Sequence, residues 1–215
     1  MEEGGISRLS TFLSLIAASA VALSGGRGFA ADADHSDWPC IQRKVEALTA
    51  AQMWDGPFDE SIRWRDNEEI TKLVAFLASR RVPLDDATAA IARFADAWPQ
   101  EGRDDALKRL FAGLLSTING DRAVVLSGIE RFQRRQRDRA AELERQAAVI
   151  RQLKAGAASG EAARAELAAV EDRYQWDARI FTERQQSLPL ACEVPVLMEQ
   201  RLFALAREIR SHMND

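Results

Sequence analysis

The chain has 215 residues, of which 29 are Lys or Arg and 33 are Asp or Glu, so its formal net charge at pH 7 is −4. So small an imbalance favours neither nucleic acid nor a uniformly anionic surface as an obligatory partner. Only 12 residues are glycine and 6 are proline, whereas Ala, Arg, Glu, Gln and Leu are abundant. This composition predicts an all-α protein.

Residues 1–30 have the pattern of a signal peptide. Arg8 precedes an apolar run over residues 9–23, and small residues around Ala30-Ala31 offer a cleavage site, although Glu2-Glu3 are unusual at such an N-terminus. We therefore expect a soluble periplasmic or secreted protein of about 185 residues, without an integral membrane span after cleavage. The alternative is a retained anchor, for which the run is shorter than the roughly 20 residues that a spanning helix needs.

The chain contains two cysteines, Cys40 and Cys192. In an oxidising compartment, two cysteines near opposite ends of a mature chain favour one disulfide over two free thiols. Pairing with a partner protein, or redox chemistry, is the alternative, but no Cys-x-x-Cys spacing supports it. An intramolecular bridge would close a loop of about 150 residues and stabilise the fold by about 5 kcal/mol in the chain-entropy model.

Residues 31–65 show little periodicity and predict an extended arm that packs on the bundle, with one short helix near Thr49 to Met53. Tryptophans in such an arm are typically packing anchors. The alternative is that they cage an organic cation or stack on the ring of a small ligand. The arm contains three of the five tryptophans: Trp38, Trp54 and Trp64.

Three amphipathic helices are predicted to follow and to form a compact core. Asp66 is expected to cap the first helix, which ends before Pro83, and the second runs on from there to Pro99. The third begins near Arg103, and Asn119-Gly120 is expected to cap or kink it. Together with the later helices, this core predicts a helical bundle over residues 66–215.

Two long helices, over residues 121–154 and 161–187, are predicted to pair as an antiparallel, coiled-coil-like hairpin that leans on the core at its base. A last helix is expected to begin at Pro195, because proline is favoured in a first helical turn. Trp98 and Trp176 lie at or beside apolar helical positions and are predicted to be core residues. Polar residues interrupt the hairpin seam at Gln136, Arg139 and Gln146.

A basic segment lies on the first hairpin helix. Its arginines could contact an acidic protein, lipid phosphate or cell-wall carboxylates, because a guanidinium binds such groups in pairs. The interpretation that we favour is a solvated helix face, paired with neighbouring acids and with the acids of the second hairpin helix. The arginines of the segment are Arg131, Arg134, Arg135, Arg137 and Arg139.

The residue types needed for catalysis are scarce. The two histidines, His35 and His212, lie near the ends of the mature chain, and no phosphate-binding loop, nucleophile elbow or His-Glu-x-x-His motif is present. Acidic pairs such as Asp85-Asp86 open helices, where capping and the helix dipole account for them. The sequence therefore predicts no catalytic residues, no metal site and no cofactor.

Three functions are consistent with these patterns. The first is a non-catalytic exported interaction or scaffold protein, such as an accessory subunit that binds another envelope protein through the charged hairpin. The second is a periplasmic small-ligand-binding domain that uses the tryptophans of the arm. The third is a carboxylate-based hydrolase. The missing catalytic groups favour the first.

Overall fold

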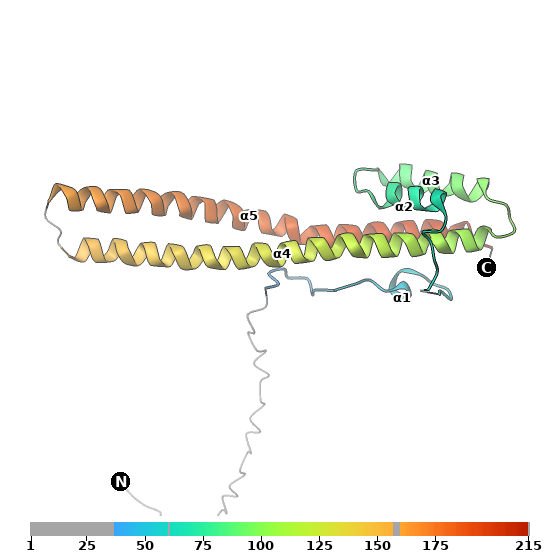
Figure 1. The fold of residues 1–215 in the computed structure, drawn as a ribbon, viewed down its shortest axis with the longest axis horizontal. Helices are drawn as coiled ribbons and strands as arrows, with labels where there is room; N and C mark the ends of the chain where they lie inside the picture. The colour runs from blue at the N-terminus through green and yellow to red at the C-terminus, as the bar shows by residue number, and fades with distance from the viewer. Residues whose placement is uncertain (1–36, 60, 157–159, 215) are drawn as a thin grey trace, which may run out of the picture. The chain divides into compact units, whose positions relative to one another are not determined.

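The computed structural model describes residues 37–59, 61–156 and 160–214, which all belong to one compact unit, Ser36–Asp215. The predicted leader and His35 lie outside these residues. The described ranges contain no β-strand, so the all-α prediction is confirmed. The helices are α1 (Ala50–Met53), α2 (Glu68–Ala78), α3 (Leu84–Ala97), α4 (Arg103–Ala155) and α5 (Glu161–Ser211) (Figure 1).

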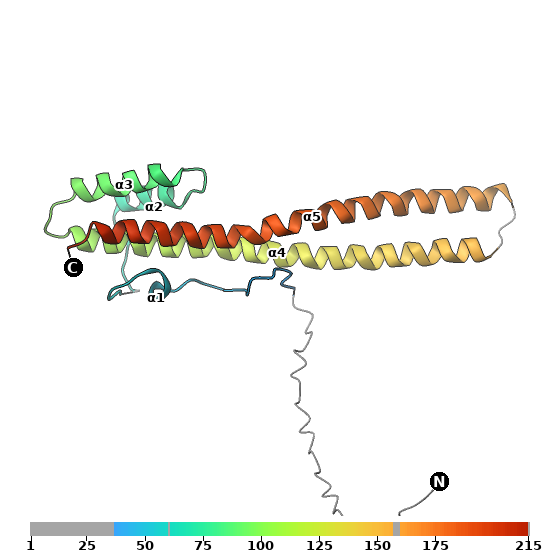
Figure 2. The ribbon, with the colours of Figure 1, turned by 180° about the vertical axis from the view of Figure 1, so that it is seen from behind.

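The base of the unit has three layers. α4 and α5 lie antiparallel along their length, with α2 and α3 on one face of the pair and the arm with α1 on the opposite face (Figures 1 and 2). The core fills the space between these layers, and its largest fully buried side chains include Leu107, Phe111, Leu202, Leu205 and Ile209. These five residues lie in the parts of α4 and α5 outside the predicted hairpin segments, so the hairpin continues from helices that themselves form the core.

α2 begins one residue later than predicted. The Asn67 side chain accepts a hydrogen bond from the Ile70 N–H at 2.9 Å and is the N-cap. Asp66, the expected cap, instead pairs with Arg63 at 3.3 Å. Either side chain can cap a helix, so the choice between adjacent candidates depends on which of them finds another partner.

α4 continues through Asn119-Gly120, where a cap or kink was predicted. Asn119 does not bind the helix end: its side chain accepts from the Leu48 N–H at 2.9 Å and donates to the Leu48 C=O at 2.8 Å. Gly120 costs about 1 kcal/mol of helix propensity. Buried residues before and after it, such as Ile118 and Leu126, hold the helix in one piece.

α5 likewise continues through Pro189 and Pro195, so the prediction of a separate last helix beginning at Pro195 is wrong. An interior proline removes a hydrogen bond and clashes with the preceding turn, at a cost of about 3 kcal/mol. Pro195 and Cys192 are buried, and their packing keeps the segment helical. Figure 1 shows α5 changing direction where its colour passes from orange to red, as expected for a proline kink.

The predicted disulfide between Cys40 and Cys192 is present, with an S–S distance of 2.07 Å and Cα atoms 5.6 Å apart. It joins the arm to the middle of α5. A disulfide is consistent with an oxidising compartment. Within the described ranges, no helix has the length and apolar character needed to cross a membrane.

Beyond Arg137, α4 and α5 continue as a two-helix hairpin (Figures 1 and 2). We call residues 138–155 and 161–181 the outer hairpin. Two of the predicted seam residues are buried. Gln136, just before the outer hairpin, donates to the Phe181 C=O at 3.4 Å, and Gln146, within it, donates to Asp177 at 2.9 Å. Polar residues at a seam fix the register of paired helices.

Trp176 is 62% exposed, so its prediction as a core residue is wrong. The physical reason lies one residue away, because Asp177 faces the seam and binds Gln146. Adjacent residues on a helix point about 100° apart, and Trp176 is therefore directed away from α4. Trp98, by contrast, packs against the core.

Candidate functional site

The tryptophans of the arm act as anchors. Trp54 and Trp64 are buried, and the Trp54 ring stacks on Phe111 with centroids 4.5 Å apart. Trp38 is half-buried and donates from its indole N–H to the Gln42 C=O at 2.7 Å. No two of these rings are in contact within the described residues. The three tryptophans therefore do not assemble into one aromatic cage.

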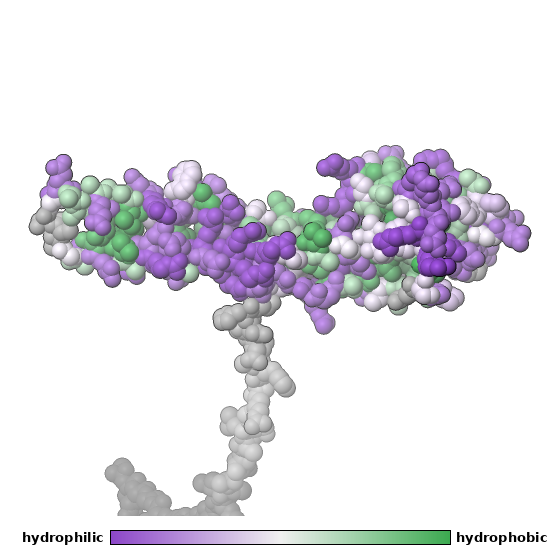
Figure 3. Space-filling view, viewed as in Figure 1, coloured by the Kyte–Doolittle hydropathy of each residue, from purple (hydrophilic) through white to green (hydrophobic). Residues whose placement is uncertain are grey.

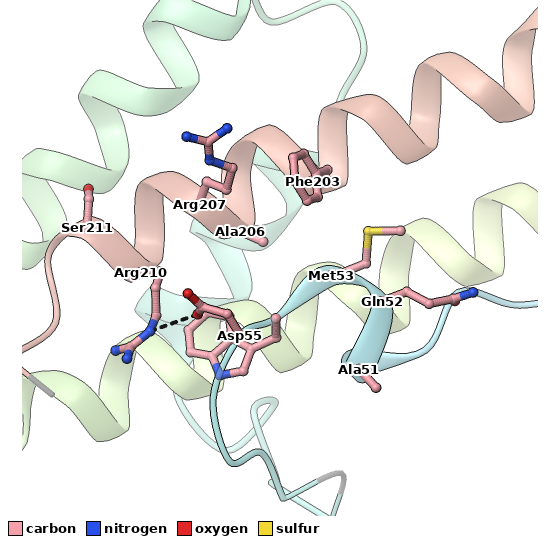
Figure 4. Close-up of a pocket in the computed structure, with 10 residues that line it drawn as sticks. Ala51, Gln52, Met53, Asp55, Phe203, Ala206, Arg207, Arg210 and Ser211 are labelled. Atoms are coloured by element: carbon pink, nitrogen blue, oxygen red, sulfur yellow. Dashed lines mark hydrogen bonds and ion pairs between the residues drawn. The ribbon is translucent and has the colours of Figure 1, made fainter.

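A hollow of about 550 Å³ lies beside Trp54, between α1 and the last turns of α5 (Figure 4). Met53, Trp54 and Ala206 give it an apolar floor, and Asp55 accepts from Nε of Arg210 at 3.0 Å. Its volume is within the range of small-molecule pockets. Figure 4 shows the Arg207 guanidinium pointing away from this ion pair. The hollow thus offers apolar surface and a neutralised ion pair.

The arginines of the basic segment have different partners: some bind the arm and one binds a neighbouring residue of α4. Arg134 and Arg137 both bind the Asp37 carboxylate in the arm, and Arg131 donates to the Ser127 hydroxyl. The hydrogen bond from Arg134, followed by that from Arg137, lowers the pKa of Asp37. Two arginines of the segment, Arg134 and Arg137, are thus paired with the arm.

Asp37 is the partner that sequence reasoning missed. The signal was indirect, since the disulfide places the start of the arm against the middle of the hairpin. Lys44 strengthens the same attachment by pairing with Glu130 at 2.6 Å, and this contact raises the Lys44 pKa. The beginning of the arm is therefore fixed to the hairpin by ion pairs as well as by a covalent bond.

Arg135 and Arg139 differ from the other arginines of the basic segment. Neither has an ion pair or a side-chain hydrogen bond to another described residue, and Arg135 is exposed. Arg135 borders an apolar groove between α4 and α5. It is the arginine of the segment that combines a free charge with a concave surface.

Two arginines outside the basic segment are held inside the fold. Arg201 donates to the C=O groups of Leu77 and Val82 at 2.8 and 3.0 Å, and so ties α5 to the end of α2 and the following loop. Arg122 is buried and donates to Val45 C=O at 3.4 Å. Burial lowers the pKa of both, while Glu199 opposes the shift at Arg122. Each of the two side chains thus joins a segment of α4 or α5 to a distant part of the chain.

The acidic pairs Glu68-Glu69, Asp85-Asp86 and Asp104-Asp105 occupy the first turns of α2, α3 and α4, as predicted. There the helix dipole favours negative charge. His212 contacts Glu208 at 3.0 Å. In the part of the chain that the structure describes, no three His, Cys, Asp or Glu residues are grouped so that they could hold a metal ion.

The outer hairpin has a charged surface with apolar exceptions. Lys154 pairs with Glu171 at 2.7 Å across the two helices. Trp176 and Val149 are exposed large apolar residues. Figure 3 shows that hydrophilic side chains cover much of the hairpin face in view, with a hydrophobic group toward its end.

Comparison with known proteins finds no matching family model, no matching curated protein and no matching solved structure.

Proposed function

We propose that this protein is a non-catalytic, exported helical interaction or scaffold protein that binds another envelope protein through the outer hairpin. The observation that carries the proposal is the exposure of Trp176 on a hairpin that has no third layer of described residues. Export is supported by the leader pattern and by the disulfide.

The outer hairpin is suited to present a binding surface. Its α4 portion extends about 27 Å at 1.5 Å per residue. The base is held by the core and the disulfide, so little conformational entropy should be lost when a partner binds. Tryptophan is enriched among the residues that dominate interface energetics. Trp176 has the charged residues Asp172, Arg173 and Arg179 three or four positions away on α5, and it fits the centre of such an interface.

The test uses Trp176→Ala in the exported, disulfide-intact protein. A partner is isolated from envelope extract, purified, and its affinity measured for the wild type and the variant. We expect binding to weaken by about 30-fold or more, the effect of losing a hot-spot residue. Phe76→Ala is the matched control, because Phe76 is an exposed aromatic residue on α2 at the base. Equal affinities for wild type and Trp176→Ala would refute the role of the outer hairpin.

Export itself is tested by intact-mass analysis before and after reduction. Loss of about 30 N-terminal residues and a mass gain of two hydrogen atoms on reduction are expected. A full-length mass would contradict cleavage, and thiols that alkylate without reduction would contradict the disulfide.

The hollow beside Trp54 supports a second candidate function, binding of a small ligand. Because Trp54 lines it, a ligand there should change tryptophan fluorescence and raise the melting temperature. A broad metabolite panel that changes neither would count against this function.

A further inference from the structure

An apolar groove of about 300 Å³ lies between α4 and α5, on the base side of the outer hairpin. Val125, Ile129 and Phe132 line it from α4, and Leu188 and Val194 line it from α5. Arg135 stands at one end. The groove is therefore an apolar surface with one positively charged end.

The groove opens on the face of the hairpin that carries α2 and α3. Val74 of α2 approaches α4 at Gly113. Arg135 lies about six whole helical turns beyond Gly113, and it therefore points to nearly the same side of α4. The arm covers the opposite face at the same level, through Asp37 and the disulfide. At the level of the groove, the arm covers one face of the helix pair. α2 and α3 lie on the other face but end nearer the base, so they do not cover the groove.

Three large apolar side chains that are close in sequence to the groove-lining residues are exposed. Val124 is 68% exposed, Leu190 67% and Leu197 52%. Leu190, Val194 and Leu197 recur at helical spacing along α5, so the rim and the lining form one continuous patch. Exposed apolar patches of this kind mark interaction sites. Figure 3 shows hydrophobic residues over the middle of the hairpin, beside the layer of α2 and α3.

The charge of Arg135 distinguishes one end of the groove from the other. Arg134 and Arg137 share the single Asp37 carboxylate as an ion-pair partner, whereas Arg135 has no acidic partner among the described residues. A ligand that fills the groove should therefore bring an acid to its Arg135 end, because a guanidinium forms paired hydrogen bonds with a carboxylate.

We propose that this groove binds an amphipathic α-helix of a partner protein, with its apolar face in the groove and an acidic side chain at Arg135. α2 already packs on this face of α4 in the same way, with Val74 against Gly113. Gly128 offers a similar small position in the groove, where an added Cβ would meet only Arg131, at 3.9 Å. Seating an amphipathic helix in such a groove is a recurring recognition mode. The inference rests on the proposed protein-binding function but uses a separate surface.

Photo-crosslinking tests the occupant. A benzophenone amino acid is placed at Val124, on the groove rim, and in a second variant at Trp176, on the outer hairpin, in the cells that make the protein. We expect the Val124 probe to label one partner segment whose apolar residues recur at helical spacing and which carries an acid. Labelling of lipid, of a second copy of this chain, of a segment without that pattern, or of nothing would overturn the inference. Labelling from Trp176 alone would leave the proposed function supported and the groove inference refuted.

The role of Arg135 is tested with the labelled segment as a synthetic peptide. Arg135→Glu should weaken peptide binding by about tenfold or more and reverse its sensitivity to salt. Arg93→Glu makes the same charge change at an exposed α3 site outside both the groove and the outer hairpin, and should bind as the wild type does. Circular dichroism of the disulfide-intact variants shows that both are folded. Equal binding by the two variants would overturn the assignment of Arg135.

Discussion

Two glycines of α4 that are seven positions apart should respond to alanine with opposite signs. Gly113 lies under α2: a Cβ there would stand 2.5 Å from Cγ2 of Val74 and 2.9 Å from Cε3 of Trp64. Gly120, two turns further on, has no such neighbour within 4 Å. Both are interior helix positions, so alanine gains the same helix propensity at each, about 1 kcal/mol.

The magnitude at Gly113 depends on whether its neighbours can move. Val74 is stiff because it is β-branched, and both Val74 and Trp64 are buried. Relief therefore requires α2 to shift away from α4, and overpacking of this kind costs about 1–3 kcal/mol. Taking about 2 kcal/mol and subtracting the propensity gain, Gly113→Ala should destabilise the fold by about 1 kcal/mol. Gly120→Ala should stabilise it by a similar amount.

The assay is thermal unfolding followed by helical circular dichroism, with the disulfide intact. For a domain of this size, about 1 kcal/mol corresponds to roughly 2–4 °C, so the two variants should move the melting temperature in opposite directions by that amount. If Gly113→Ala raised the melting temperature as much as Gly120→Ala, the close packing of α2 and Trp64 on α4 would be refuted.

Three further predictions concern the contacts that hold the layers together. Reducing the disulfide should lower the free energy of unfolding in urea by as much as about 5 kcal/mol; an unchanged urea midpoint would contradict a restraint on the unfolded chain. Arg201→Met should destabilise the protein by about 3 kcal/mol or more, because it leaves the C=O groups of Leu77 and Val82 without their charged donor; a loss below about 0.5 kcal/mol in the same assay would show that water replaces it. The hydrogen bond from Arg134 lowers the pKa of Asp37, so the contribution of Asp37 to the free energy of unfolding is present above the ordinary Asp pKa and is lost as pH falls through the lowered value. Asp37→Asn should therefore remove part of the acid-induced fall in the urea midpoint. Identical pH profiles for the wild type and the variant would contradict this.

Much of the fold followed from local patterns. Apolar residues at helical spacing located α2, α3 and the hairpin, and Thr49 to Met53 was confirmed as α1 with Thr49 as its N-cap. The disulfide was predictable because the chain has two cysteines and a leader pattern, which left one pairing to consider. Each of these inferences needs only neighbouring residues or a count.

The candidate sites were less predictable. Arg135 was identified with the rest of the basic segment, but its distinction from Arg134 depends on Asp37, nearly a hundred residues away in sequence. The groove combines residues of α4 and α5 whose adjacency follows from the register of the hairpin. No pattern of neighbouring residues predicts which α4 side chains face which α5 side chains at the groove.

The sequence by itself determined that the chain is helical, that it has one disulfide, and where its apolar stripes lie. The tertiary structure alone decided that α4 runs through Asn119-Gly120 and that α5 runs through Pro189 and Pro195. A glycine or a proline raises the free energy of a helix by about 1 to 3 kcal/mol locally. Whether the helix breaks there depends on the burial and hydrogen bonds that a continuous helix makes with distant segments, and those contacts exist only in the folded protein.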